Sequence, residues 1–310
     1  MKQFVYKIGL FIFIIVLFDI LFGFTMNHIY KKIDIGGAGR DNFICDKVSD
    51  EIIVFGSSRA EFHYNAQMIT DSLNATCYNA GESGCGIILA YGRLLMLLER
   101  HSPKAILYEI TPSFDLLDEK DNHKFLGRLK QRYDRPGIKS IFYDVDPTER
   151  YKMLSGMYRH NSSFLQNLVV YFFKISTDNA VRGFRAINQT MDTMKVRKDY
   201  IAYDSKDGFV YDSLKLHYIN KFLDKTENVN LFFVMSPMWY TQDTLVLAPI
   251  KAICKKRNIC LIDFSNNPKY VHNNEYFKDG THLNARGADE FTRDLIQELR
   301  KKEILKQREK

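Results

Sequence analysis

The chain of 310 residues is poor in cysteine, proline and tryptophan, of which it has five, seven and one. Five cysteines are too few for a disulfide scaffold, and no group of cysteines and histidines has the spacing of a zinc site. The sequence also lacks a Gly-Lys-Ser/Thr phosphate-binding loop, an internal repeat and a long Lys/Arg block, although the formal net charge is +7. We therefore expect no metal, no cofactor and no nucleic-acid partner.

Apolar residues are abundant instead. Hydrophobic residues make up 45 %, aromatic residues 14 % and charged residues 26 % of the chain. This composition excludes a disordered protein, which has few aromatics and a high charge per residue. The length predicts one large soluble domain or two small ones.

The N-terminus carries a long apolar run, Ile8–Met26, close to the ~20 residues that span a hydrocarbon core. Asp19 interrupts it, at a cost of roughly 2.5–3.5 kcal/mol if it lies at the bilayer centre, which the surrounding Leu, Ile and Phe outweigh. No small-x-small cleavage site follows the run, so an uncleaved anchor is favoured over a cleaved signal peptide or a buried helix. We predict a membrane anchor over residues 1–32, a single pass, and a main domain on the extracytoplasmic (periplasmic or cell-surface) side.

The rest of the chain alternates between strand and helix patterns. Five short apolar runs predict strands at Ile52–Phe55, Thr76–Asn79, Ala105–Ile110, Leu231–Met235 and Ile259–Asp263. Helical patterns lie at Ile87–His101, at Leu247–Arg257 and after a predicted N-cap at Asn284, through Leu299. Such alternation predicts an α/β fold over residues 48–310, a three-layer sandwich with a parallel sheet and helices on both faces.

Between residues 114 and 230 the strand rhythm stops. Helices are predicted there at Asp121–Tyr133, Pro147–Arg159 and Ser163–Phe173. We interpret residues 114–230 as a mostly helical insertion within the main domain. A lid, a substrate platform and a shell over one edge of the sheet remain open as its role.

Two short motifs carry candidate chemistry. Ser58 follows Gly56-Ser57 at the end of the first predicted strand, where ligands bind in open parallel sheets. Asp279 and His282 are three residues apart just before the last helix, a spacing that lets the carboxylate orient the imidazole. A serine hydroxyl needs such a base because it is a poor nucleophile at neutral pH.

In this order the motifs resemble those of the SGNH/GDSL hydrolase family. The first matching block is Val54–Ser58, the second is Asn79–Gly84, and the last is Asp279–His282, which continues with Leu283, Asn284 and Gly287. The resemblance implies a flavodoxin-like fold with Ser58 as nucleophile, His282 as base and Asp279 as its partner. It also implies that the backbone N–H groups of Ser58 and Gly84 form an oxyanion hole.

One block departs from the family. After the third strand the family has Gly-x-Asn-Asp, whose Asn donates a hydrogen bond to the oxyanion, whereas this chain has Glu109–Asp115. By its distance from the strand, Ser113 falls where the Asn would be. Losing an oxyanion donor costs roughly 2.7–4 kcal/mol in the barrier, so either the Ser113 hydroxyl or another group replaces it, or the reaction is slow.

The resemblance implies a membrane-anchored ester hydrolase acting on acyl esters, with O-acetyl esters of envelope or extracellular carbohydrate as the expected substrates. The anchor and the missing Asn also resemble a tethered branch that includes the D-alanyl transfer and alginate O-acetylation proteins. An acyltransferase supplied by a membrane-bound partner therefore remains an alternative, as does an inactive binding or assembly protein.

Five other residues have both a structural and a functional interpretation, and the structural one is favoured. Arg59 and His63 are interpreted as residues of an exposed helix surface, with a histidine that faces the cleft and an arginine that steers an anionic substrate as the alternatives. Tyr218, Trp239 and Tyr240 are interpreted as core or rim packing, with stacking on a sugar ring as the alternative.

Overall fold

The computed structural model describes residues 1–118, 120–176, 178–192 and 199–305, so the last five residues of the predicted 48–310 domain lie outside it. The chain divides into two compact units. Unit 1 comprises Met1–Lys47 and Asn122–Asp178, and unit 2 comprises Val48–Asp121 and Asn179–Lys310. The predicted insertion, 114–230, contributes residues to both units.

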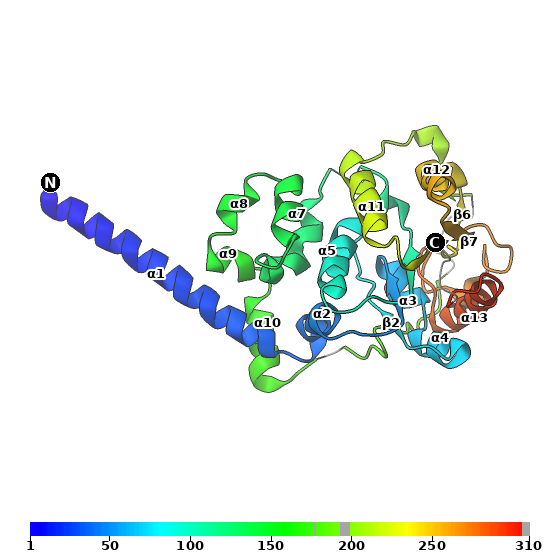
Figure 1. The fold of residues 1–310 in the computed structure, drawn as a ribbon, viewed down its shortest axis with the longest axis horizontal. Coiled ribbons are helices and arrows are strands. Elements are labelled where there is room, and N and C mark those ends of the chain that lie inside the picture. Colours follow the sequence, from blue (N-terminus) through cyan, green and yellow to red (C-terminus); the bar gives the residue numbers. More distant parts are fainter. Residues whose placement is uncertain (119, 177, 193–198, 306–310) are drawn as a thin grey trace. The chain divides into compact units, whose positions relative to one another are not determined.

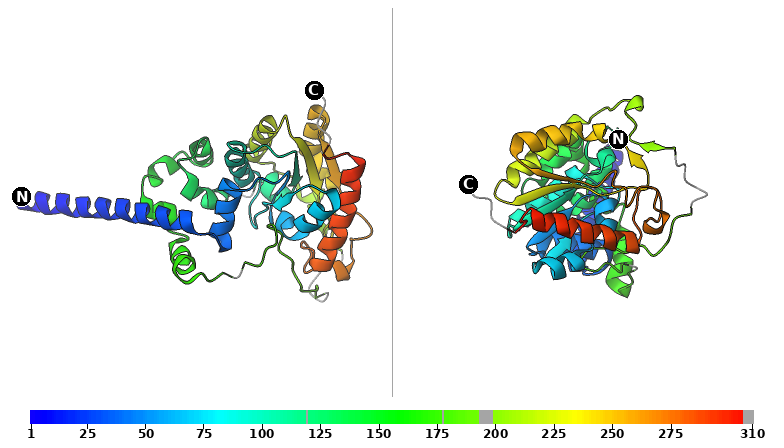
Figure 2. Two further views of the ribbon diagram at one scale, coloured as in Figure 1. Left: turned by 60° about the horizontal axis from the view of Figure 1, so that its bottom comes forward. Right: turned by 90° about the vertical axis from the view of Figure 1, so that its right-hand side faces the viewer.

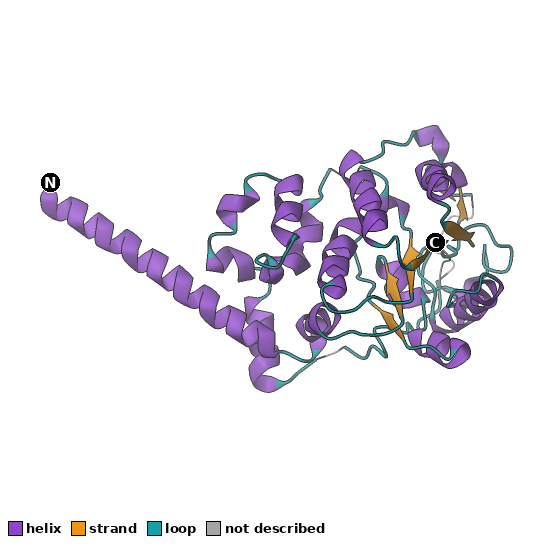
Figure 3. Ribbon diagram, in the orientation of Figure 1, coloured by secondary structure: helices purple, strands orange, loops and turns teal. Residues whose placement is uncertain are grey.

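Unit 2 is built on a five-stranded parallel sheet. Its strands are β1 (Ile52–Phe55), β2 (Cys77–Asn79), β3 (Ala105–Glu109), β5 (Asn230–Met235) and β7 (Cys260–Asp263). They are ordered β2-β1-β3-β5-β7, and every neighbouring pair is parallel. This sheet, with helices on both sides (Figures 1 and 3), confirms the predicted α/β fold.

The two faces of the sheet bury different side chains because successive residues of a strand point to opposite sides. On one face, Ile52 and Val54 pack in a core cluster with Phe291 and Leu295 of α13 (Ala285–Lys301). On the other, the Phe55 ring meets Phe222 of α11 (Ser213–Lys225) edge-on at 5.8 Å. Strands buried on both faces read as continuous apolar runs, which is why they were predictable.

The remaining helices complete these layers. On the α13 side lie α3 (Ser58–His63) and α4 (Ala66–Leu73), which both pack on α13. On the other side α5 (Ile87–Leu98) packs on α11, and α12 (Ala248–Arg257) contacts β7. Shorter elements are α6 (Pro112–Asp115), η3 (Ser205–Asp207), η4 (Thr244–Leu247), η5 (Asn274–Tyr276) and a small parallel pair, β4 (Ile201–Ala202) with β6 (Thr241–Gln242).

Unit 1 is helical and includes the predicted anchor. It consists of α1 (Lys2–Lys32), α2 (Gly36–Asp46), η1 (His123–Arg132), α7 (Ile138–Val145), α8 (Glu149–Lys152), α9 (Gly156–His160) and α10 (Phe164–Phe173). Both α9 and α10 pack on α1, whose first turns extend away from the other helices of the unit (Figure 2). By length and composition, α1 is suited to be a membrane anchor or a signal sequence.

Two of the three helices predicted in this region differ from those in the structure. The helix predicted at Asp121–Tyr133 is a 3-10 helix, η1. The helix predicted at Pro147–Arg159 is broken between α8 and α9, where Ser155 caps the start of α9 by accepting a hydrogen bond from the Tyr158 N–H at 3.2 Å. A Ser side chain that bonds to the backbone in this way favours a helix start over a helix interior. The third, at Ser163–Phe173, corresponds to α10.

Candidate active site

Ser58 is the first residue of α3, directly beyond the end of β1. The turn between them requires Gly56, because its φ of +139° is rare for side-chain-bearing residues and a Cβ there would lie 2.8 Å from the Cβ of Glu109. Ser57 is the N-cap of α3: its Oγ accepts a hydrogen bond from the Arg59 N–H at 3.2 Å and lies 2.6 Å from Thr111 Oγ1. The local sequence thus places the Ser58 hydroxyl at the carboxyl edge of the sheet.

Asp279 and His282 lie in the loop between η5 and α13. Asp279 Oδ1 accepts hydrogen bonds from the backbone N–H groups of Thr281 and His282, each at 2.9 Å, and from the Thr281 hydroxyl at 2.9 Å. These bonds fold the loop around the carboxylate. Asn284 then starts α13, where its side chain accepts a hydrogen bond from the Gly287 N–H at 2.9 Å.

The fold brings these distant segments together. His282 Nε2 lies 2.9 Å from Ser58 Oγ, and His282 Nδ1 lies 3.0 Å from both carboxylate oxygens of Asp279. Because an ionised carboxylate only accepts hydrogen bonds, it holds the proton on Nδ1 and leaves Nε2 free to accept the serine proton. A histidine placed in this way is able to activate a serine hydroxyl, and the His282 side chain is 23 % exposed.

The electrostatics of the pair agree with this protonation. Partial burial alone would raise the pKa of Asp279, but the hydrogen bond and the charge of His282, together with the Thr281 N–H, hold that pKa well below its usual range. The carboxylate therefore stays ionised at neutral pH beside the imidazole.

Gly84, the predicted oxyanion residue, lies in the exposed loop after β2 with a φ of +73°. Two contacts fix this loop against the elements that follow β1. The Glu82 N–H donates to the Gly56 carbonyl at 2.9 Å, and the N–H and hydroxyl of Ser83 both bond to Glu61, at 3.1 and 2.5 Å. The loop is thus tied to the same turn that carries Ser58, and its role in an oxyanion hole stays a prediction.

Ser113, the predicted replacement for the family's Asn, lies on α6 and is partly buried. Its carbonyl accepts a hydrogen bond from Lys215 Nζ at 2.9 Å, which fixes its backbone. Its side chain is hydrogen-bonded to Tyr203, a residue that the sequence analysis did not single out. Burial raises the pKa of Tyr203, with Arg59 and the Ser113 bond acting against the rise, so its phenol stays protonated.

The surface interpretation of Arg59 and His63 is wrong, because they are 2 % and 0 % exposed. Arg59 forms an ion pair with Glu109 at 3.1 Å and donates to Ser236 Oγ at 3.2 Å. Ser236, at the end of β5, in turn donates through its hydroxyl to Glu109 at 2.8 Å. A buried polar network thus lies directly under the start of α3.

His63 connects this network to the other half of the site. Its Nε2 accepts a hydrogen bond from the Leu283 N–H at 3.0 Å, so the proton is on Nδ1, which donates to Ser236 Oγ at 2.8 Å. Burial, followed by the Arg59 charge, lowers the pKa of His63 well below its usual value, which keeps it neutral. His63 therefore fixes the backbone of the residue that follows His282.

The packing interpretation of the three aromatic residues agrees with the structure. Tyr218 and Trp239 are fully buried, and Trp239 Nε1 donates to Asn274 Oδ1 at 2.8 Å. Tyr240 is partly exposed and packs against Gly280, where a Cβ would lie 2.0 Å from its ring. Trp239 and Tyr240 both contact the Asp279 loop at Gly280, whose carbonyl accepts a hydrogen bond from the Trp239 backbone N–H at 3.1 Å.

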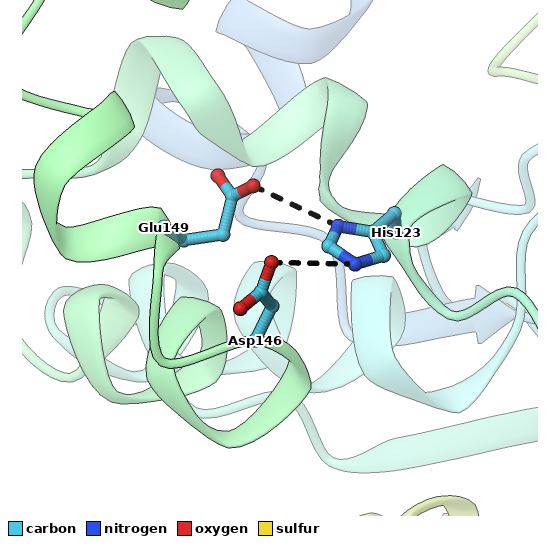
Figure 4. Close-up of side chains that lie close together, drawn as sticks. All are labelled: His123, Asp146 and Glu149. Carbon is cyan, nitrogen blue, oxygen red and sulfur yellow. Dashed lines mark ion pairs between the residues drawn. The ribbon is translucent and has the colours of Figure 1, made fainter.

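One group of potential metal ligands occurs among the described residues, in unit 1 rather than beside Ser58. His123 faces Asp146 and Glu149 with N···O distances of 3.6 and 3.7 Å (Figure 4). Lys152 Nζ lies 3.0 Å from each of the two carboxylates and already supplies a cation to the cluster. We therefore interpret the cluster as an ion-pair network.

All five cysteines are free thiols.

Comparison with known proteins leaves function to be inferred from this geometry. No family model and no curated protein matches the chain. The solved structures that are similar to the chain at low identity include the following two. A Streptococcus pneumonia protein named for platelet activating factor has a TM-score of 0.38 and 11 % identity over 94 % of this chain and 99 % of its own. The acetyl xylan esterase Est2A from Butyrivibrio proteoclasticus has a TM-score of 0.38 and 8 % identity over 84 % of this chain and 66 % of its own.

Proposed function

We propose that unit 2 is a serine ester hydrolase of the SGNH type that removes acyl groups, O-acetyl above all, from envelope or extracellular carbohydrate. The observation that carries this proposal is the hydrogen-bonded series from Ser58 Oγ through His282 to Asp279. Nucleophile, base and orienting carboxylate in one line are the arrangement that acyl transfer through a serine requires.

The proposed reaction has two steps. In the first, His282 takes the Ser58 proton, the serine oxygen attacks the ester carbonyl, and the alcohol leaves with a proton from His282. The backbone N–H groups of Ser58 and Gly84, with the Ser113 hydroxyl, stabilise the oxyanion. In the second, water attacks the acyl-serine and restores the enzyme; if a sugar hydroxyl takes the place of water, the same site performs acyl transfer.

We further propose that α1 is an uncleaved membrane anchor and that unit 2 lies on the extracytoplasmic side. Met26 and Ile29 of α1, with Ile33 directly after it, are buried in a cluster with Val170 of α10. Cleavage after the apolar run would expose this cluster to water, an unfavourable change that argues for retention of the helix.

The test is hydrolysis of p-nitrophenyl acetate by the full chain in detergent. We expect turnover by the wild type and by Ser102→Ala, a substitution at an exposed serine, and none by Ser58→Ala. Equal turnover by Ser58→Ala would refute the proposed nucleophile. Labelling of Ser58 by a fluorophosphonate probe in a chain that hydrolyses no ester would favour the acyltransferase alternative.

A further inference from the structure

Among the residues that the structure describes, two short helices are strongly apolar, and only one of them is buried. Helix α5 is surrounded by the core of unit 2, with ten of its twelve residues buried. In α10 only Asn167 and Val170 are buried, whereas Leu165, Phe172 and Phe173 are 66 %, 67 % and 69 % exposed. Helix α10 thus packs Leu168 and Val170 against the end of α1 and also turns large apolar side chains outward, unlike a helix whose outer face meets water.

A second exposed apolar group lies where α8 meets α9. Tyr151 is 62 %, Leu154 is 78 % and Met157 is 46 % exposed. Both groups belong to unit 1, and both α9 and α10 pack on α1 (Figure 1). We call the exposed apolar residues beside Asp19–Met26 the apolar seat, defined as Tyr151, Leu154, Met157, Leu165 and Val169. Phe172, Phe173 and Ile175 lie outside it, because the neighbouring Lys174 pairs with Asp34 at 3.0 Å, beyond the apolar run of α1.

Asp19 fixes the level of this seat along α1. Its carboxylate accepts hydrogen bonds from the Ser155 hydroxyl at 2.7 Å and from the N–H groups of Gly156 and Met157, each at 2.8 Å. The contact is close: a Cβ on Gly156 would lie 2.6 Å from both the Asp19 carbonyl oxygen and the Cα of Gly23. The start of α9 is therefore held against α1 at Asp19. Its N–H and hydroxyl groups supply the Asp19 carboxylate with the hydrogen bonds that water would otherwise donate.

The length of α1 before Asp19 shows whether a bilayer crossed by this helix would surround Asp19. The apolar residues Ile8–Phe18 before Asp19 make only about 16 Å of helix at ~1.5 Å per residue. A hydrocarbon core of ~30 Å needs ~20 residues, which from Ile8 reaches Asn27. A bilayer crossed by α1 therefore extends past Asp19 to the level of the α8–α9 connection.

We propose that the apolar seat is embedded in the same bilayer as α1, in the leaflet that surrounds the C-terminal half of α1, with lipid acyl chains as its partner. This inference rests on the proposed anchoring by α1. Lipid is the favoured occupant because the seat continues the exposed apolar surface of α1, where Phe18, Leu21 and Phe24 are 58 %, 56 % and 75 % exposed. The donors around Asp19 then allow that carboxylate to lie within the membrane.

The experiment is tryptophan quenching by brominated acyl chains in nanodiscs that contain the full chain. Trp239, the sole native tryptophan, is buried in unit 2 and gives a constant background. Leu154→Trp and Leu165→Trp report on the seat, and Phe11→Trp reports on α1. Leu245→Trp, at a 62 % exposed position of unit 2, is the matched control. Thermal unfolding by circular dichroism checks that each variant is folded, and Val169→Trp replaces Leu165→Trp if the latter is not.

We expect brominated lipid to quench Leu154→Trp and Leu165→Trp as strongly as Phe11→Trp, and to leave Leu245→Trp unchanged. Quenching of Phe11→Trp alone would overturn the apolar seat and leave the anchor intact, whether water or a membrane protein covers the seat. An unquenched Phe11→Trp would refute the anchor itself, so the two failures are distinguishable.

Discussion

Asp279→Asn replaces one carboxylate oxygen of the proposed Ser58–His282–Asp279 series by an NH2 group, and the structure predicts the orientation of the new amide. The backbone N–H groups of Thr281 and His282 both donate to Asp279 Oδ1, at 2.9 Å each. These donors retain an oxygen at that position, so the amide NH2 of the asparagine replaces Oδ2, which lies 3.0 Å from His282 Nδ1. Oδ1 also lies 3.0 Å from Nδ1 but already accepts three other hydrogen bonds. We therefore expect Nδ1 to accept a hydrogen bond from the new NH2, the ring proton to move to Nε2, and Ser58 to face a donor instead of a base.

The expected loss in kcat is about 10⁴-fold, the size of effect that the same change has in a serine protease with this relay. It corresponds to about 5 kcal/mol in the activation barrier, while KM changes little. The assay is steady-state hydrolysis of p-nitrophenyl acetate, with Asp71→Asn, an exposed carboxylate on α4, as the control. A kcat for Asp279→Asn within about tenfold of the wild type would refute the orienting role of Asp279.

The same variant has a predictable pH dependence of stability. The pKa of Asp279 is depressed in the folded state, so its ionised form stabilises the fold above the unfolded value of about 3.9. That contribution is lost as the pH falls through the folded-state pKa. The difference in Tm between wild type and Asp279→Asn is therefore expected to be largest near neutrality and to shrink below about pH 4. A difference that grows toward acid would contradict the assignment.

Three further substitutions test other parts of the site. Ser113→Ala is expected to lower kcat about 10²-fold with little change in KM if its hydroxyl serves the oxyanion, and an unchanged kcat would exclude that role. Arg59→Met leaves the Glu109 carboxylate buried without its cation and is expected to lower the free energy of unfolding, measured with urea, by about 3–5 kcal/mol. A decrease of less than about 1 kcal/mol would indicate that water solvates the pair. Gly56→Ala, at φ +139°, is expected to add about 1–3 kcal/mol of backbone strain and to lower turnover, measured by Tm and kcat together, and an unchanged Tm would contradict the strain.

The sheet of unit 2 was predictable because its strands are short, apolar and bounded by turn residues. The predicted strand Ile52–Phe55 coincides with β1, and the other four agree with the structure to within one residue at each end. Once the strands were assigned, the carboxyl edge of the sheet was the expected meeting place for Ser58 and the loop that carries His282. The N-cap of α13 at Asn284 was also predictable, because an asparagine side chain commonly bonds to the first backbone N–H groups of a helix.

The environments of Arg59 and His63 were not predictable, since their partners are far away in the sequence. Ser236, which contacts both, is 177 residues from Arg59 and 173 from His63. On a six-residue helix, charge and spacing alone give no sign of burial. The break between α8 and α9 has a comparable cause, because the N–H groups at the start of α9 bond to Asp19, more than 130 residues earlier.

The central claim is that Ser58 is a nucleophile activated by His282, and active-site labelling measures this most directly. The full chain is treated with a fluorophosphonate probe, digested, and the modified residue is identified by mass spectrometry. We predict a single adduct on Ser58 in the wild type, its loss in Ser58→Ala, and a strongly slowed reaction in His282→Ala. An adduct on another residue, or labelling of Ser58 that is as fast without His282, would contradict the account.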